Sequence, residues 1–301
     1  MAMKKGIPIF STVLLVAGLC IAPLAYAAGD SEINWVEGYV SATGNGAAAA
    51  RANMAQVRPL ARRAAIADAY RNLLETIKGV KIDSSTTVEN FMVTSDVIKA
   101  QVEGVVKNTK IHKEGFETQP DGSILATVEM RVCISACPGT GSLASALNVE
   151  QQKEAPYVPQ KRLQETPVVN VPPPPKGYKI IYDATRPVTG IIVNLEGLVF
   201  ERVLLPVVVA EELGDSLVTV YSAKSVSPPV IRTYGTVRYA DSVEQARNNS
   251  RLGDNAMIIP ASRITKENMI VVKGEAARLI KETTSHNNDY LSDAKVVISG
   301  Q

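Results

Sequence analysis

Two cysteines, Cys133 and Cys137, are the residues whose types and spacing most directly point to chemistry. A close cysteine pair in an oxidising compartment usually forms a disulfide. Residues four apart in an extended strand lie about 13 Å apart, which is too far for a bridge, so the bond needs a turn. Pro138 and Gly139 follow directly and are typical of a strand end. We favour a structural disulfide over a redox pair, which usually has Cys-x2-Cys spacing, and over a metal site, which needs more ligands.

A second motif, Gly44-x-Gly46-x-x-Ala49, has the spacing of a relaxed dinucleotide-binding fingerprint. In that fingerprint the glycines let the backbone approach a pyrophosphate at a helix N-terminus. The required acid about twenty residues further on would be Asp68, which falls in the middle of an expected helix. We therefore expect a strand-ending turn at Gly44-Asn45-Gly46 and no cofactor.

No arrangement of residues points to catalysis. The sequence has no Gly-x-Ser-x-Gly elbow, and its two histidines, His112 and His286, fall in an expected hairpin strand and a polar loop. We predict no catalytic, cofactor-binding or metal-ligating residue, and we expect a protein that is not an enzyme. Aromatic residues make up 5% of the chain, too few for the stacking platforms of single-strand nucleic-acid binders, so nucleic acid is not an expected partner.

Basic residues concentrate in the expected long helix before Gly79, whose only acids are Asp68 and Glu75. A solvated polar face is the plain interpretation of this pattern. The alternative is contact with an anionic partner, such as lipid headgroups or an acidic protein. The candidate contact surface consists of Arg58, Arg62, Arg63 and Arg71.

These side chains must be positioned by a first domain at 28–138, for which the pattern predicts an α+β layer. We expect a strand at 35–43 and then a helix with Leu60, Ala64, Ala67, Tyr70, Leu74 and Ile77 on its apolar side, ending at Gly79. A short strand at 80–85, a short helix at 95–103 and two strands at 105–116 and 124–132 follow. Pro120-Asp121-Gly122 joins the last two as a hairpin.

A proline-rich stretch, 139–177, separates this domain from a strand-rich mixed domain at 178–301. Its prolines disfavour a helix or a central strand, so we interpret the stretch as a linker, with an ordered arm against one domain as the alternative. The second domain has candidate strands at 190–195, 203–209, 217–221, 257–261, 269–272 and 295–298. Its expected helices are short, at 242–248 behind Asp241 as a cap and at 275–282.

The first 27 residues have the pattern of a secretory signal peptide. Lys4 and Lys5 precede an apolar run that ends in Ala25-Tyr26-Ala27. Cleavage there removes both surplus positive charges of the chain, leaving thirty basic and thirty acidic residues. Lipidation at Cys20 is not expected, because Leu19 precedes it where lipoprotein processing requires a small residue. We therefore predict a periplasmic location.

The first domain resembles the LPP-twenty lipoprotein family and the N-terminal domain of flagellar assembly protein T. The resemblance rests on Gly38–Gly44, on Arg62–Glu75 with its Ala-Asp-Ala centre, on Ile77–Val80 and on the strands around Asp121-Gly122. A weaker second resemblance, over 189–198, 220–221 and 251–255, is to a module found with such domains in other bacterial exported proteins. The resemblance implies a structural protein of the periplasm or the outer membrane, with flagellar assembly as the best-known setting.

Together these observations lead to one leading hypothesis and one alternative. The leading hypothesis is a non-enzymatic envelope protein that acts through contacts with other envelope proteins or with itself, with outer-membrane association left open. The alternative is a periplasmic protein that binds a small molecule.

Overall fold

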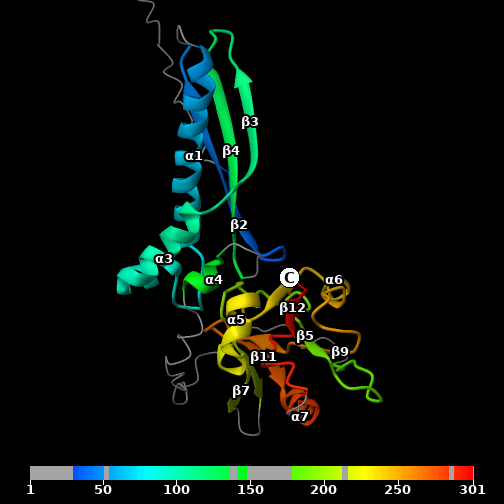
Figure 1. The fold of residues 1–301 in the computed structure, drawn as a ribbon. Helices are drawn as coiled ribbons and strands as arrows, with labels where there is room; N and C mark the ends of the chain where they lie inside the picture. Colours follow the sequence, from blue (N-terminus) through cyan, green and yellow to red (C-terminus); the bar gives the residue numbers. More distant parts are fainter. Residues whose placement is uncertain are drawn as a thin grey trace, which may run out of the picture.

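The computed structural model describes residues 30–50, 54–135, 141–147, 178–211, 216–284 and 288–300. The expected signal peptide, Cys137, His286 and most of the expected linker lie outside the described residues. The described part is a mixed α+β structure, which confirms the predicted fold class. Figure 1 shows a helix-backed N-terminal sheet that extends away from the more compact C-terminal part.

The N-terminal sheet is antiparallel, in the order β1-β2-β4-β3. A long helix, α1 (Met54–Lys78), lies along one face of it, and the other face is open in Figure 1. The hairpin between the last two strands turns at Asp121-Gly122 as predicted, with Gly122 at φ 79°. The strands are β1 (Ser31–Asn34), β2 (Tyr39–Ala48), β3 (Ile111–Thr118) and β4 (Ile124–Cys133).

The expected turn at Gly44-Asn45-Gly46 is wrong, because β2 continues through it to Ala48. The two glycines are sites of close approach to α1. A Cβ on Gly44 would lie 2.3 Å from the carbonyl oxygen of Ala65, and a Cβ on Gly46 would lie 2.2 Å from the backbone nitrogen of Ala65. Only glycine leaves room for the helix backbone at these positions.

The buried side of α1 also differs from the prediction. Leu60, Ala64 and Ala67 are exposed, and of the predicted positions only Ile77 is fully buried. The buried residues instead recur at every fourth position, so α1 packs against the sheet through one continuous ridge. A ridge with this spacing runs at about 26° to the axis of its own helix. This ridge consists of Val57, Ala61, Ala65, Ala69, Leu73 and Ile77.

Two short helices follow α1: α2 (Val88–Thr94) and α3 (Asp96–Lys107). The predicted strand at 80–85 is wrong, because only one isolated bridge, Lys81 to Thr87, forms there. The predicted helix at 95–103 exists but continues through Gly104, so the strand expected from 105 begins only at Ile111. A glycine inside a helix costs only about 1 kcal/mol, which burial of Val102 and Val106 offsets.

One described segment falls within the expected linker. Residues 141–147 contain the short helix α4 (Leu143–Ala146), and both Leu143 and Leu147 are fully buried. The expectation of no helix in this stretch is therefore wrong here, since α4 contributes to the core.

The C-terminal part contains two four-stranded sheets, in the orders β8-β12-β5-β9 and β10-β11-β6-β7. The first sheet is parallel throughout, and the second combines one parallel pair with two antiparallel pairs. The strands are β5 (Gly190–Asn194), β6 (Val208–Glu211), β7 (Leu217–Tyr221), β8 (Arg238–Ala240), β9 (Ala256–Pro260), β10 (Arg263–Ile264), β11 (Ile270–Lys273) and β12 (Val296–Ser299).

Most predicted C-terminal elements lie within a few residues of the observed ones, including helices α6 (Val243–Arg247) and α7 (Gly274–Thr283). The cap of α6 is Ser242 rather than Asp241, since the Ser242 hydroxyl accepts from the Gln245 amide. Pro228 and Pro229 begin helix α5 (Pro228–Tyr234), where the missing amide hydrogens of proline cost nothing. A 3-10 turn, η2 (Ala223–Ser225), precedes α5.

Candidate functional site

The predicted arginine surface lies on α1, and three of its four members contact neighbouring groups. The Arg62 Nε lies 2.8 Å from the Glu114 carboxylate on β3, and the Arg58 guanidinium lies 4.0 Å from the centre of the Phe116 ring. Arg71 forms an ion pair with Asp68, one helical turn away. Arg58 and Arg62 therefore link α1 to β3 and also face solvent.

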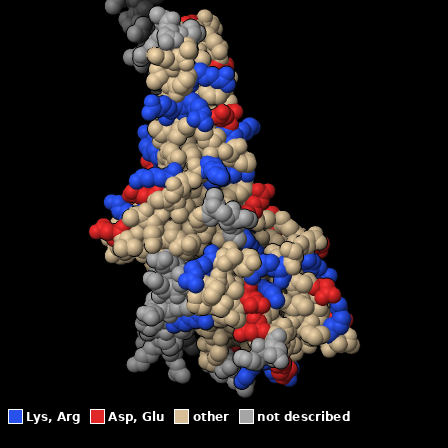
Figure 2. Space-filling model, in the orientation of Figure 1, with Lys and Arg blue, Asp and Glu red and all other residues tan. Residues whose placement is uncertain are grey.

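Arg63 differs from the others. It is exposed and has no ion-pair partner among the residues that the structure describes. Figure 2 shows Lys and Arg side chains spread over the part of the surface that carries α1. Arg63 is thus the member of the predicted surface that is available to a partner.

Asp68, the acid that the dinucleotide fingerprint would place on a ribose, has a structural role. Its carboxylate accepts a hydrogen bond of 3.0 Å from the Asn45 amide of β2. The side chain of Asn72 donates to the Thr43 carbonyl at 2.8 Å. These two α1 side chains therefore provide hydrogen-bond partners for backbone groups on the edge of β2, beyond the end of β1.

The predicted disulfide stays a prediction. Cys133 is the last residue of β4, and Cys137 lies outside the described residues. Cys133 also lines an open groove of about 840 Å³ between α3, α4 and the ends of β3 and β4. Gly104, His112 and Arg131 line the same groove.

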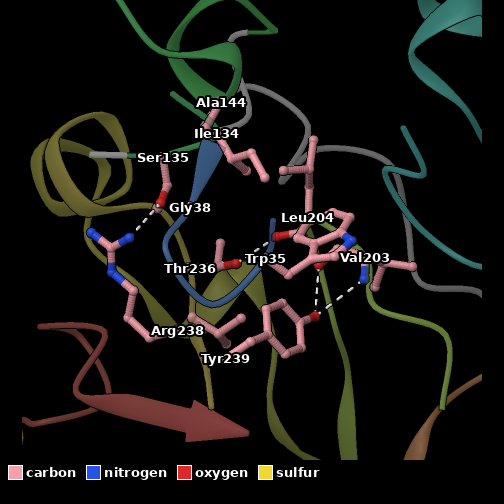
Figure 3. Close-up of a pocket in the computed structure, with 12 residues that line it drawn as sticks. Trp35, Gly38, Ile134, Ser135, Ala144, Val203, Leu204, Thr236, Arg238 and Tyr239 are labelled. Atoms are coloured by element: carbon pink, nitrogen blue, oxygen red, sulfur yellow. Dashed lines mark hydrogen bonds between the residues drawn. The ribbon is translucent and has the colours of Figure 1, made fainter. Parts of the chain in front are cut away.

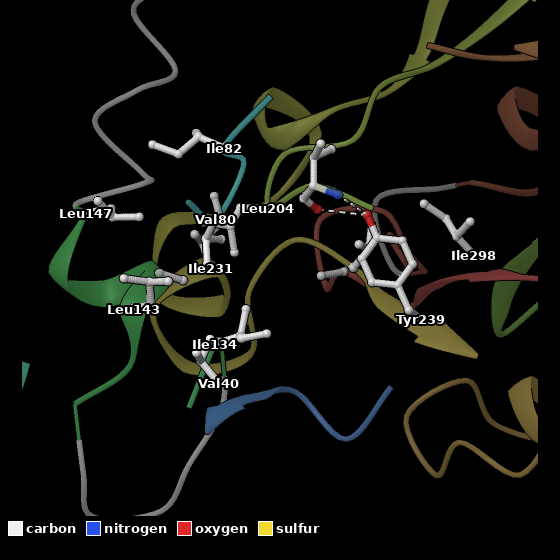
Figure 4. Close-up of a cluster of buried hydrophobic side chains, with 14 of the residues drawn as sticks. Val40, Val80, Ile82, Ile134, Leu143, Leu147, Leu204, Ile231, Tyr239 and Ile298 are labelled. Atoms are coloured by element: carbon white, nitrogen blue, oxygen red, sulfur yellow. Dashed lines mark hydrogen bonds between the residues drawn. The ribbon is translucent and has the colours of Figure 1, made fainter. Parts of the chain in front are cut away.

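The two parts of the molecule meet at a joint that combines backbone pairing with an ion pair. The amides of Leu204 and Leu205 donate to the carbonyls of Lys81 and Ile82, at 3.1 and 2.8 Å. The Lys81 ammonium lies 2.5 Å from the Glu201 carboxylate. One hydrophobic cluster crosses this joint, and Figure 4 shows Val80 and Ile82 beside Leu204 and Ile231.

Aromatic side chains complete the joint. The Trp35 and Tyr239 rings meet edge to face, with centroids 5.6 Å apart. The Tyr239 hydroxyl donates to the Val203 carbonyl at 2.7 Å and accepts from the Val203 amide (Figure 3). Burial raises the pKa of Tyr239, so the phenol stays protonated and keeps this donor. The cavity between these residues has about 20 Å³, which is room for one water molecule.

In Figure 3, the Arg238 guanidinium points toward Ser135 and donates to its hydroxyl at 3.1 Å. The sequence does not identify Arg238, Tyr239 and Trp35 as a group. No local pattern connects them, because Trp35 and Ser135 come from the N-terminal part and the others from β8.

Within the described ranges, no group of three or more His, Cys, Asp or Glu residues is placed to hold a metal ion. No helix in those ranges is both long and apolar enough to cross a membrane.

Fold and joint together define a two-module α+β protein whose modules share one core. Residues 30–130 match the LPP20 lipoprotein family, and residues 190–299 match the second domain of Treponema pallidum Tp0624. The first match confirms the predicted resemblance of the first domain to this family, and the second match agrees with the weaker resemblance of the C-terminal part to a second module. The LPP20 match indicates an exported, envelope-associated protein. A search of curated proteins finds no match to this chain.

Proposed function

We propose that this protein is a non-enzymatic component of the cell envelope that acts in structure or assembly through protein–protein contacts. The observation that carries the proposal is the N-terminal layer, which extends from the body and exposes the outer side of α1 (Figures 1 and 2). The LPP20 match supports the envelope setting. A flagellar or outer-membrane role is the specific form of this proposal that the resemblance to flagellar assembly protein T favours.

The outer side of α1 is a better contact surface than the free edge of the sheet. Edge strand β3 carries Lys113, Glu114 and Glu117, and charged side chains on an edge oppose strand addition. The outer side of α1 combines the exposed Arg63 with Ala64, Ala67 and Leu60, and Leu60 is 38% exposed. Small and apolar side chains beside a free cation suit an acidic protein partner or a second copy of the chain.

The test is the native mass of the mature protein and its co-purifying partners, isolated from envelope fractions under mild conditions. The variant Arg63→Glu reverses the charge of the surface, and Lys99→Glu makes the same change on the exposed side of α3. We expect the wild type and Lys99→Glu to be recovered in a complex and Arg63→Glu to be recovered alone. A monomeric wild type without partners would overturn the proposal, as would a complex that Arg63→Glu leaves intact.

The groove beside α3 favours a second candidate, a small-molecule-binding protein, because about 840 Å³ falls in the range of ligand sites. A Cβ on Gly104 would meet nothing within 4 Å, so Gly104→Leu fills part of the groove without a clash. Native mass spectrometry of the purified protein separates the candidates. A bound small molecule that Gly104→Leu releases would support the second candidate, and a wild-type protein without ligand would contradict it.

A further inference from the structure

The open groove beside α3 begins where β3 and β4 stop pairing. Ile111, the first residue of β3, pairs with Met130, so the end of β4 from Arg131 to Cys133 extends past the last pair. This unpaired end of β4 lines the groove together with one side of α3. The α3 residues in the lining are Gln101, Gly104 and Val105. The groove is therefore bounded mainly by regular elements.

The charged side chains that line the groove are basic. They are Lys110, His112 and Arg131, and no Asp or Glu is among the described lining residues. Arg131 is already paired, because its Nε lies 2.8 Å from the Glu129 carboxylate and its guanidinium lies 4.2 Å from the centre of the Tyr39 ring. Lys110 and His112 are exposed, and their side chains have no partner within the described part of the chain. These two side chains are available to an anion.

A β-bulge sets His112 apart from the rest of β3. The register against β4 shifts between Ile111 and Lys113, so His112 has no partner residue on β4. A bulge re-aims a side chain relative to the regular pleat of the strand. His112 lines the groove, whereas the next residue, Lys113, is not among the described lining residues. Because a histidine ring has an N–H donor in every protonation state, His112 can hold an acidic oxygen beside Lys110.

Apolar side chains line the groove beside these donors. Val105 and Ile111 are half-buried, and Val132 and Ala146 are almost fully buried. Covering the exposed part of such side chains with hydrocarbon is favourable. The groove volume of about 840 Å³ is far larger than a bare acetate or phosphate ion needs. The lining therefore suits a ligand that has both an acidic group and an apolar body.

We propose that this groove binds an amphipathic acid, a molecule with a carboxylate or phosphate group on an apolar chain. The acidic group lies at Lys110 and His112, and the chain lies along Val105 and Ile111. This inference rests on the second candidate of the proposed function, that the groove is a ligand site, and it adds the charge and polarity of the ligand. It is independent of the proposed contact surface on α1.

The experiment measures binding of decanoate, and separately of decyl phosphate, to the full mature protein by isothermal titration calorimetry. Both acids are used below the concentration at which they form micelles. Decanol has the chain without the charge, and acetate has the charge without the chain. We expect saturable binding of at least one of the two amphipathic acids. Decanol and acetate should each bind at least about tenfold more weakly, because each lacks one of the two contributions.

The variant Lys110→Gln should weaken binding of the acid at least about threefold, because an exposed ion pair is lost. The matched control is Lys113→Gln, which removes a second exposed lysine three positions further along and should bind as the wild type does. Both variants should keep the wild-type melting temperature, since both side chains are exposed. Gly104→Leu, which fills part of the groove, should reduce binding of the acid further than Lys110→Gln does.

Three results would overturn the proposal. One is the lack of saturable binding of either amphipathic acid. Another is equal binding of decanol and decanoate, which would leave the groove as a ligand site but remove its preference for acids. The third is an equal loss of binding in Lys110→Gln and Lys113→Gln. Only the first of these results also counts against the groove as a ligand site.

Discussion

At the scale of single residues, the lack of a side chain at Gly44 and at Gly46 decides how closely α1 lies on β2. Gly46→Ala would place a Cβ 2.2 Å from the Ala65 nitrogen and 2.3 Å from the Ala61 oxygen. Neither contact can relax by a side-chain rotation, because both atoms belong to the helix backbone. We expect the free energy of unfolding to fall by about 3 kcal/mol or more, as measured by urea denaturation.

The matched control is Gly115→Ala on β3, where a Cβ would meet nothing within 4 Å. This variant should change stability by less than about 1 kcal/mol, since alanine fits a strand at least as well as glycine. Equal stability of the two variants would show that α1 is not held against β2 by this contact.

The cysteine pair leads to a second prediction at this scale. If Cys133 and Cys137 are bridged, the mature denatured protein should resist alkylation until a reductant is added. The loop between them is short, so reduction should lower the free energy of unfolding by only about 2 kcal/mol. The double variant Cys133→Ser/Cys137→Ser should be insensitive to reductant. Alkylation of both cysteines before reduction would refute the bridge.

At the scale of elements, the sequence correctly predicted the strands and turns that are determined by their own residues. The strand at 217–221 and the hairpin turn at Asp121-Gly122 are found as expected. A run rich in β-branched residues between turn residues, or a glycine at positive φ, specifies such structure without help from distant segments. The α+β class followed from the order of these elements.

Other elements depend on neighbours that the local sequence does not show. The buried ridge of α1 passes through Ala61, Ala65 and Ala69 because Gly44 and Gly46 admit the helix there. Helical periodicity alone favoured the larger Leu60, which is exposed. Alanine gives little hydrophobic signal, so a ridge of alanines against glycines cannot be recognised by size.

The residues of the candidate site also divide into those that the sequence predicts and those that it does not. The arginines of α1 were predicted because they follow one another on a single helix. The joint residues were not, because Ser135 and Arg238 are separated by more than a hundred positions and meet only through tertiary packing.

At the scale of the whole molecule, the shared core makes the two modules one cooperative unit. The joint buries Val80, Ile82 and Leu204, and adds backbone hydrogen bonds between the modules. Unfolding one module therefore exposes apolar surface on the other. We expect the wild type to unfold in a single transition that is the same by Trp35 fluorescence and by far-UV circular dichroism.

Leu204→Asp should separate the two modules, because it places a carboxylate without a partner in the buried joint. The fluorescence transition should then move to a lower urea concentration and precede the loss of secondary structure. Val199→Asp makes the same kind of change five positions earlier, at a residue that is 89% exposed, and should keep a single transition. If Leu204→Asp also unfolded in one step at the wild-type midpoint, the buried joint around Leu204 would not be what makes the two modules unfold together.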